Sequence, residues 1–84
     1  MPPPPAHITV FPNPVRNNVS VRMPPNAYKG MRLIDINGRV LANYAIAAGA
    51  SLFTKNIYLP SGIYFLHFTG NKKTEVRKIL VIGR

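Results

Sequence analysis

Leu59-Pro60-Ser61-Gly62-Ile63-Tyr64-Phe65-Leu66-His67-Phe68 is the stretch that decides the fold. Proline at the second position and glycine at the fourth position of residues 59–62 predict a type I turn. The six residues that follow are large and apolar or aromatic, apart from one histidine, and this composition favours a β-strand. Alternation places Tyr64, Leu66 and Phe68 on one face of that strand. Because both faces are largely apolar, we expect a central strand that is covered on both sides.

The rest of the chain consists of further short segments with strand-like alternation, separated by turn residues. Asn37-Gly38 joins two of them and predicts a type I′ hairpin turn, because both residues accept a positive φ. Gly70-Asn71-Lys72-Lys73 predicts another turn. With turn signals about every 8–12 residues, the pattern predicts an all-β fold, a sandwich of about seven antiparallel strands. The expected strands are residues 8–11, 19–22, 31–36, 39–44, 52–58, 63–68 and 74–82.

In the last expected strand, residues 74–82, two interpretations remain open for the placement of Val76 and two for the role of Lys78. Val76 does not share a face with Ile79 and Val81. Either a bulge lies between them, or Val76 faces the opposite surface of the sheet. Lys78 places a charge in an otherwise apolar strand, and both a binding role and the protection of an edge strand against aggregation explain it.

The N-terminal segment differs in composition from the rest of the chain. Residues 1–7 include four consecutive prolines and predict an extended polyproline II linker, so we assign residues 8–84 to one domain. Pro12-Asn13-Pro14 ends the first strand, because proline has no N–H and disfavours helix in the residue before it. We find neither a signal-peptide pattern nor an apolar run of about 18 residues, the length of a membrane-spanning helix. Either the protein is cytoplasmic or it is a piece of a longer secreted chain, and the initial Met followed by four prolines favours the second alternative.

The charge balance is strongly basic, with 11 Lys and Arg residues against two acidic residues and a net charge of +9. Such an excess predicts weak attraction to polyanions, although a solvated basic surface explains it equally well. A nucleic-acid interface would need aromatic side chains exposed beside basic ones. The aromatic residues here have the pattern of a core, so we expect no specific nucleic-acid partner.

The sequence shows no arrangement of residues that is typical of catalysis or of metal binding. It has no cysteine, which excludes a disulfide framework and thiolate metal sites. The two acidic residues, Asp35 and Glu75, have no evident pairing: the first flanks the hairpin turn and the second lies in the last strand. His67 alternates with apolar strand residues, and no metal-ligand spacing appears. We therefore expect no enzymatic activity, no cofactor and no metal site.

Four elements, in chain order, resemble the C-terminal sorting domain of cargo proteins of the type IX secretion system (the Por secretion system tail, type A). The resemblance covers about residues 8–84, and the elements end at the C-terminus. Phe11 stands where the family often has tyrosine, and the chain continues two residues past Ile82. The matching elements are Val10-Phe11-Pro12-Asn13-Pro14, residues 31–41 with Asp35-x-x-Gly38-Arg39, Leu59-Pro60-Ser61-Gly62-Ile63-Tyr64, and Lys78-Ile79-Leu80-Val81.

The resemblance implies an immunoglobulin-like sandwich that directs a cargo protein across the outer membrane of a Bacteroidetes-type bacterium. It implies an outer-membrane translocon and a sortase-like surface peptidase as partners. The peptidase would remove the domain and join the cargo to anionic lipopolysaccharide. The protein would pass through the periplasm and then lie at the cell surface or outside the cell.

The resemblance also implies where such a signal is recognised. Gly62 and Tyr64 are better explained as fold determinants than as direct contacts. A carbohydrate- or protein-binding module on the same sandwich is the alternative function, because a fold does not decide a function. The candidate recognition residues are Pro12, Asn13, Pro14, Gly38, Gly62, Tyr64, Lys78, Ile79 and Val81.

Overall fold

The computed structural model describes residues 8–70 and 74–83, and this part of the chain folds into strands without any helix. Every expected strand is present, and its ends lie within two residues of the predicted ones. The predicted linker, residues 1–7, and most of the predicted turn at 70–73 lie outside the described residues. The strands are β1 (Thr9–Phe11), β2 (Asn18–Arg22), β3 (Gly30–Asp35), β4 (Val40–Ala45), β5 (Leu52–Asn56), β6 (Gly62–Thr69) and β7 (Thr74–Val81).

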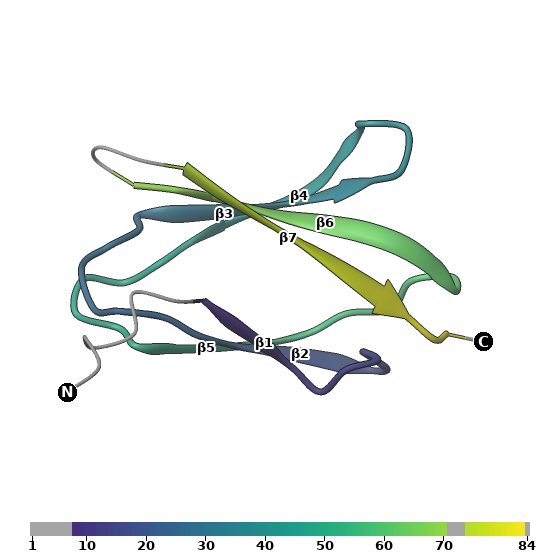
Figure 1. Ribbon diagram of the computed structural model, residues 1–84, viewed down its shortest axis with the longest axis horizontal. Coiled ribbons are helices and arrows are strands. Elements are labelled where there is room, and N and C mark those ends of the chain that lie inside the picture. The colour runs from purple at the N-terminus through teal and green to yellow at the C-terminus, as the bar shows by residue number, and fades with distance from the viewer. Residues whose placement is uncertain (1–7, 71–73, 84) are drawn as a thin grey trace, which may run out of the picture.

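The strands form two sheets that pack face to face, as Figure 1 shows. One sheet has the order β1-β2-β5, the other has the order β4-β3-β6-β7, and all pairs within them are antiparallel. The chain passes from one sheet to the other after β2, β4 and β5. This is the arrangement of an immunoglobulin-like sandwich whose fourth strand has joined the sheet of the third, sixth and seventh. The predicted fold class is confirmed.

The core consists of alternate side chains that point between the two sheets. In β6 these are Tyr64, Leu66 and Phe68, as the alternation predicts, and Phe68 is fully buried. The expectation that β6 is covered on both faces is wrong, because Ile63 is 37% exposed and Phe65 and His67 are only partly buried. The strand is central within its sheet, between β3 and β7, but a two-layered sandwich covers only one face of each sheet.

The hairpin between β3 and β4 forms at the predicted place with a different turn. Within this loop only Gly38 has a positive φ, at 86°, so the loop is not a type I′ turn, which needs positive φ at Asn37 as well. The Gly38 N–H donates to the Asp35 carbonyl (3.0 Å), and the Asp35 N–H donates to the Arg39 carbonyl (2.9 Å). These bonds close a three-residue loop that ends in a left-handed glycine.

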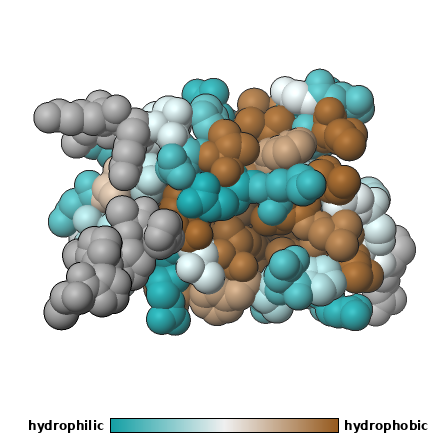
Figure 2. Space-filling model, viewed as in Figure 1, coloured by the Kyte–Doolittle hydropathy of each residue, from teal (hydrophilic) through white to brown (hydrophobic). Residues whose placement is uncertain are grey.

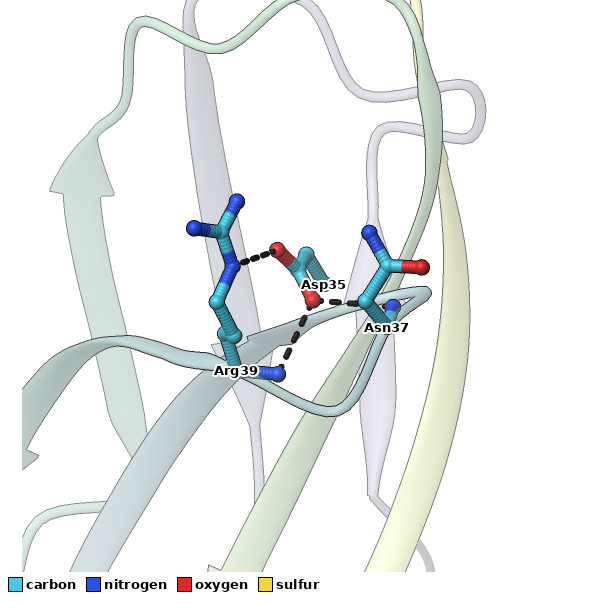
Figure 3. A network of polar contacts seen from close by, with 3 residues as sticks. All are labelled: Asp35, Asn37 and Arg39. Carbon is cyan, nitrogen blue, oxygen red and sulfur yellow. Dashed lines mark hydrogen bonds and ion pairs between the residues drawn. The ribbon is translucent and has the colours of Figure 1, made fainter.

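The side chain of Asp35 explains why the longer loop is preferred. Its Oδ1 accepts hydrogen bonds from the N–H groups of Asn37 and Arg39, both at 2.9 Å, and its Oδ2 contacts Arg39 Nε at 3.2 Å (Figure 3). These amides are available to the carboxylate only when the loop has this shape. The Arg39 N–H, followed by the other donors, holds the pKa of Asp35 below its ordinary value. Asp35 is therefore a turn residue, as its position in the sequence indicates.

The corner between β5 and β6 is held by side chains instead of by the predicted type I turn. The chain bends at Ser61 without closing a hydrogen-bonded turn over residues 59–62. The Tyr64 hydroxyl instead donates to the carbonyl of Pro60 at 2.8 Å. A tyrosine near the start of the sixth strand makes the same kind of bond in immunoglobulin domains. Tyr64 thus fixes the corner as well as filling the core, where it is 8% exposed.

The alternation along β7 is continuous. Its register with β6 runs without a shift from Thr74 opposite Thr69 to Val81 opposite Gly62. No bulge lies between Val76 and Ile79, so Val76, which is 53% exposed, faces the outer surface of the sheet. The register shift of this sheet lies between β3 and β4 instead.

Candidate functional site

The N-terminal Pro12-Asn13-Pro14 segment leads the chain from β1 to the edge of the other sheet, before β2 returns to the sheet of β1. β1 ends at Phe11, and both prolines follow cis peptide bonds. Val15 then lies against the outer edge of β7, where its N–H donates to the Leu80 carbonyl and its carbonyl accepts from the Ile82 N–H, both at 2.8 Å. This parallel bridge joins the segment after the first strand to the end of the last strand. We call it the Val15 bridge.

Two pockets flank this junction, one on each side of β7. The inner pocket, about 150 Å³, opens between the edges of the two sheets, and the outer pocket, about 280 Å³, lies on the exposed face. Asn13, Lys78 and Ile79 line both of them. Hydrophobic residues gather over the middle and right of this side of the molecule (Figure 2), where Figure 1 places β7 and the C-terminus. The inner pocket is completed by Val10, Pro12, Val15 and Arg77, and the outer pocket by Ile63 and Leu80.

β7 is an edge strand, and only part of its edge is occupied. The Val15 bridge bonds to the outward backbone groups of Leu80 and Ile82. Since the backbone alternates with a period of two, the N–H and C=O groups of Val76 and Lys78 also point outward. No described strand pairs with that part of β7. The structure therefore leaves a short stretch of strand edge open beside the two pockets.

The charges along this edge are unequally balanced. Arg77 contacts Glu75 at 3.0 Å, and its guanidinium also donates to the Val76 carbonyl at 3.1 Å. Lys78 is exposed, and it takes part in neither of the ion pairs found among the described residues. Within residues 8–70 and 74–83, the edge therefore presents a cation without an acidic partner.

The structure brings some of the predicted recognition residues together and separates the others. Asn13, Lys78 and Ile79 meet at both pockets and Pro12 joins them at the inner one, although these residues come from opposite ends of the domain. Their role in recognition remains a prediction. The remaining candidates have positions that explain them structurally. Pro14 leads into the Val15 bridge, Val81 is fully buried, Gly62 and Tyr64 pair with β7, and Gly38 lies at the opposite edge of the sheet.

The roles of two residues at this site, Val15 and Gly83, were not predicted from the sequence. Val15 is an ordinary apolar residue after a proline, and nothing in the sequence indicates its pairing with β7. Gly83 exchanges hydrogen bonds with Ser61, with its N–H donating to Ser61 Oγ at 2.9 Å. A side chain at Gly83 would overlap the carbonyl of Leu59. The only sequence feature that could have indicated this close approach is the presence of a glycine just after the last strand.

A larger cleft, about 440 Å³, lies at the same end of the sandwich and was not predicted either. It separates the β1–β2 connection, at Arg16 and Asn17, from the β5–β6 corner, at residues 57–60. Tyr58 lines it and is 82% exposed. No residue of the predicted recognition set lines this cleft.

Three further features bear on function in the described residues: clusters of metal ligands, membrane-spanning helices and paired carboxylates. Residues 8–70 and 74–83 contain no cluster of three or more side chains of the types that hold metal ions. Over the same ranges there is no helix long and apolar enough to cross a membrane. Asp35, whose carboxylate is occupied by the hairpin, lies at the β4 side of the sheet, away from Glu75 in β7.

Comparison with known proteins identifies the family. Residues 9–82 match the family model described as the secretion system C-terminal sorting domain. A search of curated proteins found none that matches the chain. The family match extends from the first residue of β1 to the residue after β7, and so it includes both halves of the Val15 bridge. The chain therefore belongs to the secretion system C-terminal sorting domains, the signals that direct proteins into type IX secretion.

Proposed function

We propose that type IX secretion machinery at the outer membrane reads this sorting domain as a folded unit. The surface that it reads is the β7 edge with the two pockets, both of which Asn13 and Lys78 line. The Val15 bridge is the observation that supports this proposal. Because it joins segments from opposite ends of the domain, neither segment forms the surface as an isolated peptide.

In this proposal the domain is a signal and a substrate, and it is not an enzyme. It passes through the periplasm attached to its cargo and arrives at the cell surface or outside the cell. A sortase-like surface peptidase then cleaves the chain before β1 and attaches the cargo to the surface. The position of β1 at the edge of its sheet supports cleavage at this place, because cleavage before an edge strand leaves the core intact.

The basic surface adds weak contact with anionic lipopolysaccharide. Among the described residues, exposed cations occur on both sheets and in loops, including Lys29, Arg39 and Lys55. Dispersed charge gives non-specific attraction that salt screens. We expect binding to lipopolysaccharide vesicles to fall steeply between about 50 and 200 mM salt, as for other polyanion contacts. Tight binding that salt does not change would contradict this part of the proposal.

Export of a fusion protein tests the central part. The domain is attached to a periplasmic reporter in a type IX-competent cell, and surface export is compared with the melting temperature of each purified domain. The variants are Lys78→Ala, a truncation that lacks residues 81–84, and Lys29→Ala as a control. Lys29 is an exposed cation in the loop before β3, so its removal changes the net charge equally without touching the β7 edge.

We expect Lys78→Ala to lower export several-fold while the domain stays folded, because the side chain is exposed. Lys29→Ala should be exported like the unchanged fusion. The truncation should lose both export and stability, since Val81 is fully buried. If export followed the melting temperature in every variant, the β7 edge would hold no specific signal.

A further inference from the structure

We propose that the open edge of β7 receives an extended segment of the secretion machinery as an additional strand of the four-stranded sheet. The segment that fits carries an acidic side chain next to an apolar one. This inference rests on the proposed function and specifies how the same surface is read. It is carried by the backbone geometry of β7, the Val15 bridge, the inner pocket and the unbalanced charge of Lys78.

The backbone of β7 provides the hydrogen-bonding groups. Val76 and Lys78 direct their N–H and C=O groups away from β6, because the Val15 bridge uses the Leu80 carbonyl and the Ile82 N–H on that same side. The Val76 carbonyl accepts from the Arg77 guanidinium at 3.1 Å, so an added strand would use the two N–H groups and the Lys78 carbonyl first. Unpaired groups of an edge strand are a template for another strand. Peptide-binding domains use such edges, where main-chain bonds give affinity and alternate side chains give specificity.

The Val15 bridge limits where an added strand fits. It occupies the edge at Leu80 and Ile82, so a partner can pair only with residues 74–79. Val15 itself is 1% exposed, and it therefore does not move aside without exposing core. The open edge is thus short, which disfavours indiscriminate pairing and suits one defined segment.

The side chains next to this edge define the chemistry of the partner. Neighbouring strands place opposed side chains on the same face of a sheet. A residue opposite Lys78 lies beside its ammonium group on the outer face, and an acidic side chain there would neutralise the unpaired cation. The residues before and after it point inward, over the inner pocket. The inner pocket has a volume of about 150 Å³, which is enough for one apolar side chain.

A second copy of this chain fits the edge less well than an acidic partner does. An antiparallel copy centred on Arg77 or on Lys78 would place that cation directly against the same residue of the other copy. Like charges directly opposite each other destabilise a strand pair. With a net charge of +9, the chain also repels its own copies over longer distances.

Proline substitution tests the strand addition directly. Proline is tolerated at edge positions whose N–H faces away from the sheet. Val76→Pro removes one outward N–H and keeps Lys78, whereas Val76→Ala shortens the side chain and keeps the N–H. Asn43→Pro is the matched control at the β4 edge. The Ile46 N–H donates to the Lys29 carbonyl at 2.9 Å and therefore faces the β3 side. Since the backbone alternates, the N–H of Asn43 faces away from β3.

A charge series tests the acidic partner without changing the backbone. Lys78→Glu would oppose an acidic side chain, and Lys78→Arg would retain the attraction. All variants are placed in the reporter fusion in a type IX-competent cell, and each purified domain is melted. We expect Val76→Pro and Lys78→Glu to lower export about tenfold or more with a folded domain, as lost main-chain and ionic contacts would. Val76→Ala, Lys78→Arg and Asn43→Pro should each be exported better than the two disruptive variants.

The outcomes separate this inference from the proposed function. If the unchanged fusion were exported but Val76→Pro passed as well as Val76→Ala, strand addition would be excluded while surface reading would stand. If Lys78→Glu and Lys78→Arg were exported equally, the partner would not be acidic. Loss of folding in Val76→Pro would also count against the inference, since the N–H would then have a partner within the domain. Failure of the unchanged fusion would instead contradict the proposed function.

Discussion

β4 and β7 are the two outer edges of the same sheet, and the chain protects them in different ways. The β4 edge has a register shift against β3, where Leu41 is the extra residue, and it ends in the hairpin that Asp35 holds. Bulges and tight hairpins make an edge irregular and so prevent pairing. The β7 edge is regular, but the Val15 bridge covers one end and Lys78 places a charge in the rest. Under the proposed function, β4 is the edge that is closed to partners and β7 is the selective one.

The largest effect is expected from a substitution that unfolds the whole domain and so removes both edges. Tyr64 lies in β6, fills the core and bonds to the Pro60 carbonyl. We expect Tyr64→Ala to lower the free energy of unfolding by about 3–5 kcal/mol, a large part of what a domain of this size has. Urea denaturation measures it. Tyr64→Phe removes only the hydroxyl and should cost about 0.5–1.5 kcal/mol. A melting temperature that changed by only a degree or two in Tyr64→Ala would place this side chain at the surface.

A smaller effect is expected at the β7 edge alone. A side chain at Gly83 would overlap the Leu59 carbonyl, so Gly83→Ala should lower the free energy of unfolding by about 1–3 kcal/mol, as overpacking does. Gly62→Ala is the control, because its Cβ would meet Tyr64 at an ordinary 3.7 Å. We expect it to cost about 0.5 kcal/mol or less. Equal losses in both variants would show that β7 does not close against the β5–β6 corner as described.

The β4 edge has a corresponding glycine. Gly38 has a φ of 86°, which a β-branched residue adopts only with strain, so Gly38→Val should cost about 1–2 kcal/mol. Gly38→Asn should cost less, since asparagine tolerates this conformation. Denaturation gives the stability of each variant, and the reporter fusion gives its export. Because Gly38 lies at the opposite edge from Lys78, a folded Gly38→Val domain should still be exported. An export defect without unfolding would show that the β4 edge is also read.

The smallest effect is the pH dependence of the β4 hairpin. Hydrogen bonds from Arg39 and Asn37 lower the pKa of Asp35 in the folded chain. The unfolded chain therefore binds this proton more readily, and stability rises with pH across the interval between the two pKa values. The contribution is present above the ordinary value, about 3.9, and is lost as the pH falls through the folded pKa. Melting temperatures of the unchanged chain should thus fall more steeply below about pH 4 than those of Asp35→Asn. Parallel curves would contradict the role of this carboxylate.

The fold was largely predictable from sequence because the strands are short, alternating and separated by turn residues. The inward alternation of Tyr64, Leu66 and Phe68 and the position of the Asn37-Gly38 hairpin follow from local pattern alone. The turn type did not, since the Asp35 carboxylate selects the loop through bonds that the pattern does not encode. Coverage of β6 was also misjudged, because an apolar outer face in a two-layered sandwich remains exposed.

The candidate site was predictable in its parts but not in its assembly. The residues of Pro12-Asn13-Pro14 and Lys78-Ile79 were recognised by resemblance, as separate motifs. Their meeting depends on Val15, a single residue paired with a strand far along the chain. Such long-range pairing leaves no local signature, and for the same reason the contact of Gly83 with the β5–β6 corner was missed.

A double-mutant cycle on export tests most directly whether the two motifs act as one surface. Asn13→Ala, Lys78→Ala and their combination are measured in the reporter fusion, beside a control cycle of Asn13→Ala with Lys29→Ala. Residues that share a partner give non-additive effects of about 0.5–3 kcal/mol, whereas distant ones add. We expect the Asn13–Lys78 double variant to lose at least about threefold less export than the product of the single effects, and the control pair to multiply. If both cycles multiplied alike, Asn13 and Lys78 would act independently, and the composite surface would be contradicted.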